Sequence, residues 1–140
     1  MAKRILITQR HTEMLDTMAD WLRAAGYRVS LCTGPSQVRY DCMAHSFDDC
    51  PLWRDVDLVI YDPWVATSYG GGDQFVLEMA RHPETPAFVW GPSAIPLDVA
   101  ELVEQGKVDA LPLQLTRDVL IAAVEQRIGP ALETARSIQA

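Results

Sequence analysis

Short apolar runs along this chain alternate with longer segments in which apolar residues recur every three or four positions. The runs at residues 5–7, 58–61 and 87–90 are continuous in apolar residues, which is typical of parallel strands covered on both faces. Residues 29–32 alternate in polarity, which predicts a strand nearer the edge of a sheet. Residues 108–113 provide a fifth candidate strand.

Helical periodicity fills most of the intervals between these runs. Apolar residues at helical spacing predict one helix over residues 14–25, and Gly26 then supplies a helix end. A second helix is predicted over residues 96–105. A third is predicted over residues 117–128, directly after Thr116, whose hydroxyl can cap a helix N-terminus.

The chain of 140 residues is the size of one domain. We assign residues 1–128 to that domain and residues 129–140 to a short C-terminal tail, predicted to be helical. The interval at residues 33–56 does not fit the alternation, because it has no apolar stripe where a helix should return to the sheet. A loop of this length in a compact domain is typically functional or contains an unrecognised element.

Strands that alternate with helices predict βα units joined by right-handed crossovers. Five such units indicate a flavodoxin-like α/β fold, a three-layer sandwich around a five-stranded parallel sheet in the order 2-1-3-4-5. Ligands and chemistry gather at the carboxyl ends of the strands in sheets of this kind. The loops after Thr8, Asp62, Trp90 and Leu113 are therefore the expected positions of a functional site.

Composition and charge exclude several classes of function. A 49% share of hydrophobic residues supports a sizeable core, and a net charge of −7 argues against nucleic-acid or anionic-membrane partners. No apolar segment reaches the ~20 residues of a membrane span, and the first apolar run is too short for a signal peptide. Three cysteines, an odd number, make a structural disulfide framework improbable in a reducing compartment. We therefore expect a cytoplasmic protein without a disulfide framework.

With the elements placed, the chain resembles the receiver domain of two-component response regulators. The strongest match is residues 57–64, Asp-Leu-Val-Ile-Tyr-Asp-Pro-Trp, which are similar to the family's third strand and put Asp62 at the phospho-accepting position. Residues 86–90 and 106–111 resemble the fourth and fifth strands. The resemblance covers nearly the whole chain, apart from residues 33–56 and the tail.

The resemblance also implies Mg²⁺-dependent phosphoryl transfer, for which the family supplies two acids just after the first strand. Those positions here hold Gln9 and Arg10. The family's hydroxyl residue after the fourth strand corresponds to Gly91, and its lysine after the fifth corresponds to Leu113. We therefore interpret the chain as a pseudo-receiver, a non-catalytic signalling or protein-interaction module that is not phosphorylated.

Asp62 has two interpretations from sequence. Its carboxylate can cap the turn that begins at Pro63, which is common chemistry at the end of a strand. Alternatively, it pairs with Arg10, because the first and third strands are neighbours in this topology and a guanidinium can occupy the place of the metal. Such an ion pair would hold this edge of the sheet in one state without phosphorylation.

Three thiols and an imidazole lie in or beside the atypical loop: Cys32, Cys42, His45 and Cys50. The spacing from Cys42 to His45 is half of a zinc-knuckle pattern, and three thiolates can also hold an iron–sulfur cluster. A metal-binding or thiol redox-sensing module is therefore the main alternative function. The simpler interpretation is that the cysteines are small buried residues and that no cofactor is present.

A remote alternative is an enzyme similar to nucleoside 2-deoxyribosyltransferases. Residues 57–61, the glycines at 70–72 and the strand at 86–90 are faintly similar to that family, with Glu78 as its nucleophile. The spacing from the glycines to Glu78 departs from the family pattern, and the family's early Gly-Pro motif is absent.

The partners are expected from the resemblance to receiver domains. Receivers pair through the face made by their fourth helix, fifth strand and fifth helix, which implies a protein partner or a homodimer here. Trp53 and Trp64 flank the third predicted strand and are expected to be partly exposed. His11 and His82 have no partner motif, so we expect both to be solvated.

Overall fold

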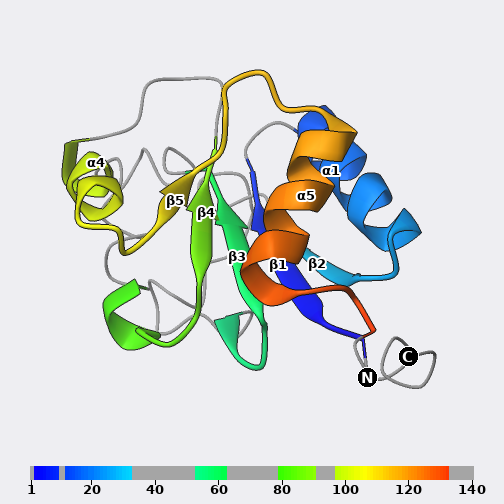
Figure 1. The fold of residues 1–140 in the computed structure, drawn as a ribbon, viewed down its shortest axis with the longest axis horizontal. Helices are drawn as coiled ribbons and strands as arrows, with labels where there is room; N and C mark the ends of the chain where they lie inside the picture. Colours follow the sequence, from blue (N-terminus) through cyan, green and yellow to red (C-terminus); the bar gives the residue numbers. More distant parts are fainter. Residues whose placement is uncertain (1, 10–11, 33–52, 63–78, 91–96, 133–140) are drawn as a thin grey trace, which may run out of the picture.

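The computed structural model describes residues 2–9, 12–32, 53–62, 79–90 and 97–132, which contain a five-stranded parallel sheet in the order β2-β1-β3-β4-β5 (Figure 1). This order and the flavodoxin-like α/β architecture confirm the prediction. The strands are β1 (Arg4–Thr8), β2 (Arg28–Cys32), β3 (Leu58–Tyr61), β4 (Ala87–Val89) and β5 (Asp109–Ala110).

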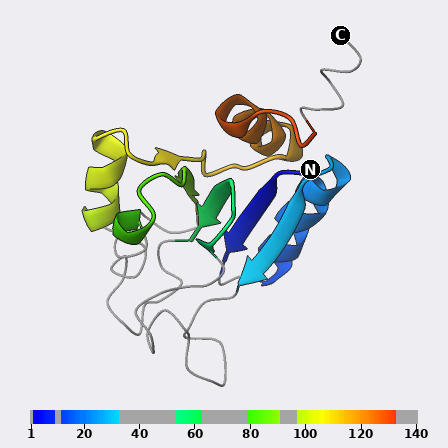
Figure 2. The same cartoon turned by 90° about the horizontal axis from the view of Figure 1, so that it is seen from below.

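Helices lie on both faces of the sheet, which gives the predicted three layers (Figure 2). The helices α1 (Thr12–Ala24) and α5 (Arg117–Ile128) cover one face. The helix α4 (Leu97–Glu104) covers the other face, where residues 79–81 are also helical. Alternate residues of β1 point to opposite faces, so Ile5 and Ile7 join the α1–α5 core and Leu6 joins the α4 core.

The helix ends follow the chemistry predicted from sequence. Thr116 caps α5, because its hydroxyl accepts a hydrogen bond from the Val119 N–H at 3.3 Å. On α1, three residues of the predicted stripe are buried in the core, Leu15, Met18 and Leu22, and the rest of the stripe is partly buried. No helix in the described part of the chain is long and apolar enough to cross a bilayer.

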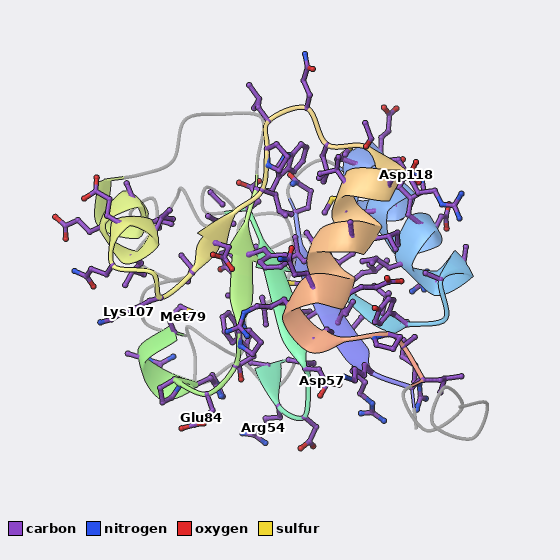
Figure 3. All side chains as sticks on the ribbon, in the orientation of Figure 1. Arg54, Asp57, Met79, Glu84, Lys107 and Asp118 are labelled. Atoms are coloured by element: carbon purple, nitrogen blue, oxygen red, sulfur yellow. The ribbon has the colours of Figure 1, made fainter. Side chains whose placement is uncertain are left out.

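The segment that precedes β3 contradicts one expectation. Trp53 is only 2% exposed, contrary to the expected partial exposure, and its indole ring stacks on His82 with the ring centroids 5.5 Å apart. His82 is half-buried, so the prediction of a solvated imidazole is also wrong. The next residue, Arg54, is exposed and lies at the amino end of β3, as Asp57 does (Figure 3).

The chain after α5 is tied to the amino ends of β1 and β2. The Lys3 backbone N–H donates to the Ala131 carbonyl at 3.0 Å, and the Lys3 Nζ donates to the Ile128 carbonyl. The Tyr27 hydroxyl donates to the Gly129 carbonyl at 2.7 Å. Residues 129–131 are therefore packed, Leu132 is exposed, and none of the four is helical. The remaining residues of the predicted helical tail lie outside the described part.

Tyr27 makes the stability of this contact dependent on pH. Burial raises the pKa of Tyr27 to about 12, and the charge of Glu125 adds to the rise. As the pH rises, the phenol therefore ionises first in the unfolded chain. Its contribution to the free energy of unfolding is complete below about pH 10 and is lost as the pH rises toward 12. We expect urea titrations to show a loss of about 1–2 kcal/mol over this range for the wild type but not for Tyr27→Phe. An equal loss in both proteins would contradict this assignment.

Candidate functional site

Four residues form a row at the carboxyl edge of the sheet, one position beyond the paired strand ends. Hydrogen bonds continue the ladder there: Asp62 N–H donates to the Thr8 carbonyl at 2.7 Å, and Trp90 N–H donates to the Tyr61 carbonyl at 3.1 Å. The strand registers then give the row across the edge, in the order Gln9, Asp62, Trp90 and Leu111.

The centre of this row is polar and buried. Asp62 and Gln9 are each 1% exposed, and Thr8 is 4% exposed. Burial of a carboxylate is unfavourable unless hydrogen bonds or an opposite charge compensate it. The buried carboxylate of Asp62 therefore depends on such compensating groups. Its predicted partner Arg10 lies outside the described residues, and the ion pair stays a prediction.

This donor set does not fit the magnesium ion that receiver chemistry requires. A hard divalent cation needs several oxygen ligands with net negative charge, and Gln9 contributes only a neutral amide beside the single carboxylate of Asp62. Across the described ranges, no group of three or more histidine, cysteine, aspartate or glutamate side chains is close enough to hold a metal. Gly91 and Arg10 lie outside those ranges.

The end of β5 corrects one detail of the sequence alignment. We expected a strand over residues 108–113 with Leu113 in the lysine position, but β5 contains only Asp109–Ala110. The Leu111 N–H donates to the Val89 carbonyl at 3.0 Å, which places Leu111 beside Trp90. Leu113 is 67% exposed two residues later. An aliphatic residue therefore occupies this end of β5 in either alignment.

Trp90 joins β4 to the connection between β5 and α5. Its side chain is 8% exposed, and the indole Nε1–H donates to the Pro112 carbonyl at 2.8 Å. A buried indole N–H needs an acceptor, so this hydrogen bond fixes both the ring and the backbone at Pro112. The sequence predicted a buried Trp90 but could not identify its acceptor.

The predicted cysteine site cannot be assembled from the described residues. Cys32 is half-buried at the end of β2, in register with Thr8. Cys42, His45 and Cys50 all lie outside the described residues, as does Glu78 of the enzyme alternative. A zinc or iron–sulfur site on the cysteine loop therefore stays a prediction.

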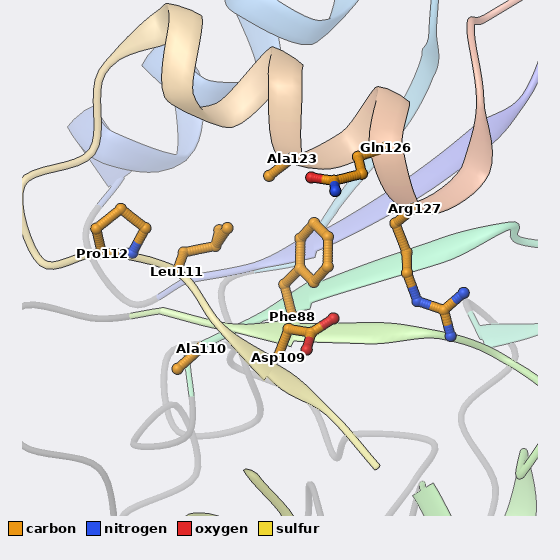
Figure 4. A pocket seen from close by; sticks show the side chains of 8 residues that line it. All are labelled: Phe88, Asp109, Ala110, Leu111, Pro112, Ala123, Gln126 and Arg127. Atoms are coloured by element: carbon orange, nitrogen blue, oxygen red, sulfur yellow. The ribbon is translucent and has the colours of Figure 1, made fainter. Parts of the chain in front are cut away.

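A groove with a volume of about 430 Å³ runs between β5 and α5 (Figure 4). The ring of Phe88 lies in it, between the two elements. Charged and amide side chains border it: Asp109 comes from β5, and Gln126 and Arg127 come from α5. The remaining lining residues are Ala110, Leu111, Pro112 and Ala123. An apolar floor with a polar border is the usual composition of a protein-binding surface.

Comparisons with known proteins identify this arrangement by its structure and not by its sequence. No protein-family model matches the sequence, and no curated protein matches it. The structure is similar to a CheY-like response regulator receiver domain protein from Methanospirillum hungatei JF-1, with a TM-score of 0.69 and 16% identity over 91% of this chain and 94% of that chain.

The structure is also similar to two further receiver domains. The non-phosphorylated HemR receiver domain from Leptospira biflexa has a TM-score of 0.67 and 19% identity over 90% of this chain and 94% of that chain. A response regulator receiver domain protein from Clostridium thermocellum has a TM-score of 0.65 and 17% identity, and covers 99% of both chains. This chain therefore has the fold of response regulator receiver domains.

Proposed function

We propose that this chain is a receiver-like signalling module that acts by binding another protein and is not phosphorylated. The observation that carries the proposal is the row at the carboxyl edge of the sheet. By the resemblance to receivers, Asp62 corresponds to the phospho-accepting aspartate, whereas Gln9 and Leu111 correspond to positions at which the receiver reaction needs an acid and a lysine. A single buried carboxylate supplies too little charge to recruit Mg²⁺.

The hydrogen bond of Trp90 supports a module with one fixed surface. It joins the end of β4 to Pro112 in the connection that leads to α5, and both Phe88 and Pro112 line the adjacent groove. A docking surface that is already formed avoids the entropy of ordering it on binding. We therefore propose that the partner docks in the β5–α5 groove.

Acetyl phosphate is the direct test of the non-phosphorylated state. We expect incubation with acetyl phosphate and Mg²⁺ to leave the intact mass unchanged, because the described residues in the row with Asp62 include neither a second acid nor a lysine. An active receiver domain in the same buffer is the positive control. A stable gain of one phosphoryl group in the wild type, absent from Asp62→Asn, would overturn the non-catalytic interpretation.

A second copy of the chain is the partner we propose for the groove. The border of the groove carries one acid, Asp109, and one base, Arg127, so two copies related by a two-fold axis can pair these charges crosswise. We expect Arg127→Asp to weaken self-association about tenfold in sedimentation velocity, since like charges then face each other.

The charge-swapped double variant Asp109→Arg/Arg127→Asp is the matched control for this dimer. It should recover most of the lost affinity, because the opposite charges are again paired. A wild type that stays monomeric at the highest attainable concentration contradicts the homodimer and leaves a different protein as the partner.

A cytoplasmic location belongs to the same proposal. It rests on the sequence, in which no apolar segment reaches the ~20 residues that a membrane span requires. The enzyme alternative gains no support from the comparisons, which found receiver domains.

A further inference from the structure

A cavity of about 540 Å³ lies at the opposite edge of the sheet, where the strands begin. It is separate from the Asp62 row and from the β5–α5 groove, so a ligand bound there is independent of the proposed function. Its lining is mostly charged and consists of Ala2, Lys3, Arg4, Arg28, Asp55 and Asp57. The volume is within the range of about 300–1,000 Å³ that small-molecule sites occupy.

Two arginines form one side of this cavity. Arg4 and Arg28 are in register at the first positions of β1 and β2, and both are exposed. Neighbouring strands are about 4.8 Å apart, so the two positive side chains start close together. Within the described part of the chain, neither guanidinium takes part in an ion pair or a hydrogen bond. An oxyanion between them would relieve their repulsion.

The third basic residue of the cavity has a different role. The Nζ of Lys3 donates to the Ile128 carbonyl at the end of α5, and its backbone N–H donates to Ala131. Lys3 therefore closes the cavity on the side of α5 and adds positive charge next to the two arginines. The guanidinium groups remain the ones available to a ligand.

Two carboxylates form the other side, on the turn that leads into β3. The Asp57 Oδ2 accepts a hydrogen bond from the Arg4 backbone N–H at 2.8 Å, which fixes the turn against β1. Asp55 has a φ of 59° and is the one non-glycine residue with positive φ in the described ranges. Aspartate tolerates this conformation better than most residues do. Both side chains are exposed and open to the cavity.

The positive groups on one side of the cavity and the negative groups on the other indicate the chemical class of its ligand. Two guanidinium forks can bind a phosphate dianion with several parallel hydrogen bonds, whereas a single carboxylate needs only one fork. Carboxylates on the facing side accept hydrogen bonds from hydroxyl groups but repel a second anion. We propose that this cavity binds a phosphate monoester that also carries hydroxyl groups, as sugar phosphates do.

Isothermal titration with ribose 5-phosphate at low ionic strength tests the site. We expect saturable binding at one site per chain, and a loss of at least about tenfold in affinity for both Arg4→Gln and Arg28→Gln. The matched control is Arg117→Gln, which removes an exposed arginine from the first turn of α5 at the other edge of the sheet. That variant should bind as the wild type does.

A comparison of ribose 5-phosphate with inorganic phosphate tests the role of Asp55 and Asp57. Asp55→Asn and Asp57→Asn should weaken ribose 5-phosphate but not inorganic phosphate, since only the ester has hydroxyl groups to donate. Circular dichroism checks the fold of each variant. If a glutamine variant does not fold, Arg4→Lys and Arg28→Lys replace it, because they keep the charge and lose the fork.

Three results would overturn the proposal. The first is no saturable binding of ribose 5-phosphate by the wild type. The second is an equal loss of affinity in Arg117→Gln, which would indicate attraction to the surface as a whole. The third is inorganic phosphate binding as tightly as ribose 5-phosphate, with neither ligand weakened by Asp55→Asn or Asp57→Asn, which would indicate an adventitious ion only.

Discussion

Replacing Trp53 by alanine should destabilise the protein by about 3–5 kcal/mol, the largest effect we expect from a single substitution in the described residues. The indole is 2% exposed, lies in the core beneath α4, and contacts His82 and Tyr61 with ring centroids 5.5 and 6.2 Å away. Its removal leaves a cavity between the start of β3 and the start of β4. Total stability is typically about 5–15 kcal/mol, so a substantial unfolded fraction is expected.

Urea unfolding followed by circular dichroism measures this loss without relying on tryptophan fluorescence. Trp53→Phe keeps a ring against His82 and should lose clearly less stability than the alanine variant. Leu113→Ala is the matched control, because Leu113 is 67% exposed and should change stability by no more than about 0.5 kcal/mol. A Trp53→Ala midpoint equal to that of the wild type would show that the ring does not stabilise the core.

Trp53 also shows which kind of contact could not be predicted from the sequence. The strands and their order were predictable, since an apolar run such as residues 58–61 is a local signal, and so was the cap at Thr116. The stack of Trp53 on His82 joins residues from two different loops and has no periodic pattern. It becomes visible only when β3 and β4 are placed side by side.

The same distinction applies to the candidate site. Asp62 and Gln9 could be assigned to one edge from topology alone, because both directly follow strands that neighbour each other. Leu111 could not be distinguished from Leu113, because the register of β5 depends on where the connection from α4 ends. The buried position of Ala131 was missed for a related reason: its contact with Gly26 depends on a turn about a hundred residues away in sequence.

The acceptor for the Trp90 indole was likewise beyond the sequence. A strand of two residues, β5, leaves Pro112 outside any regular element, so its carbonyl is available. No local pattern marks such a carbonyl as a partner for a side chain 22 residues earlier. This hydrogen bond and the stack of Trp53 on His82 both join loops, and neither has a local sequence pattern.

Asp62 should be energetically coupled to Arg10. Its carboxylate is 1% exposed at the carboxyl edge of the sheet, and Gln9 beside it is neutral. We expect Arg10→Ala to destabilise the wild type by about 1–3 kcal/mol and to cost much less in an Asp62→Asn background, because the second protein has no charge left to compensate.

The double-mutant cycle needs a control for the general loss of a cation from an acidic chain. Arg117→Ala serves, since Arg117 is exposed in the first turn of α5, and its effect should add to that of Asp62→Asn within about 0.5 kcal/mol. A coupling energy of zero between Arg10 and Asp62 would mean that the aspartate is compensated within its own turn. A clear coupling would instead support the ion pair, which would hold this edge of the sheet in one state without phosphorylation.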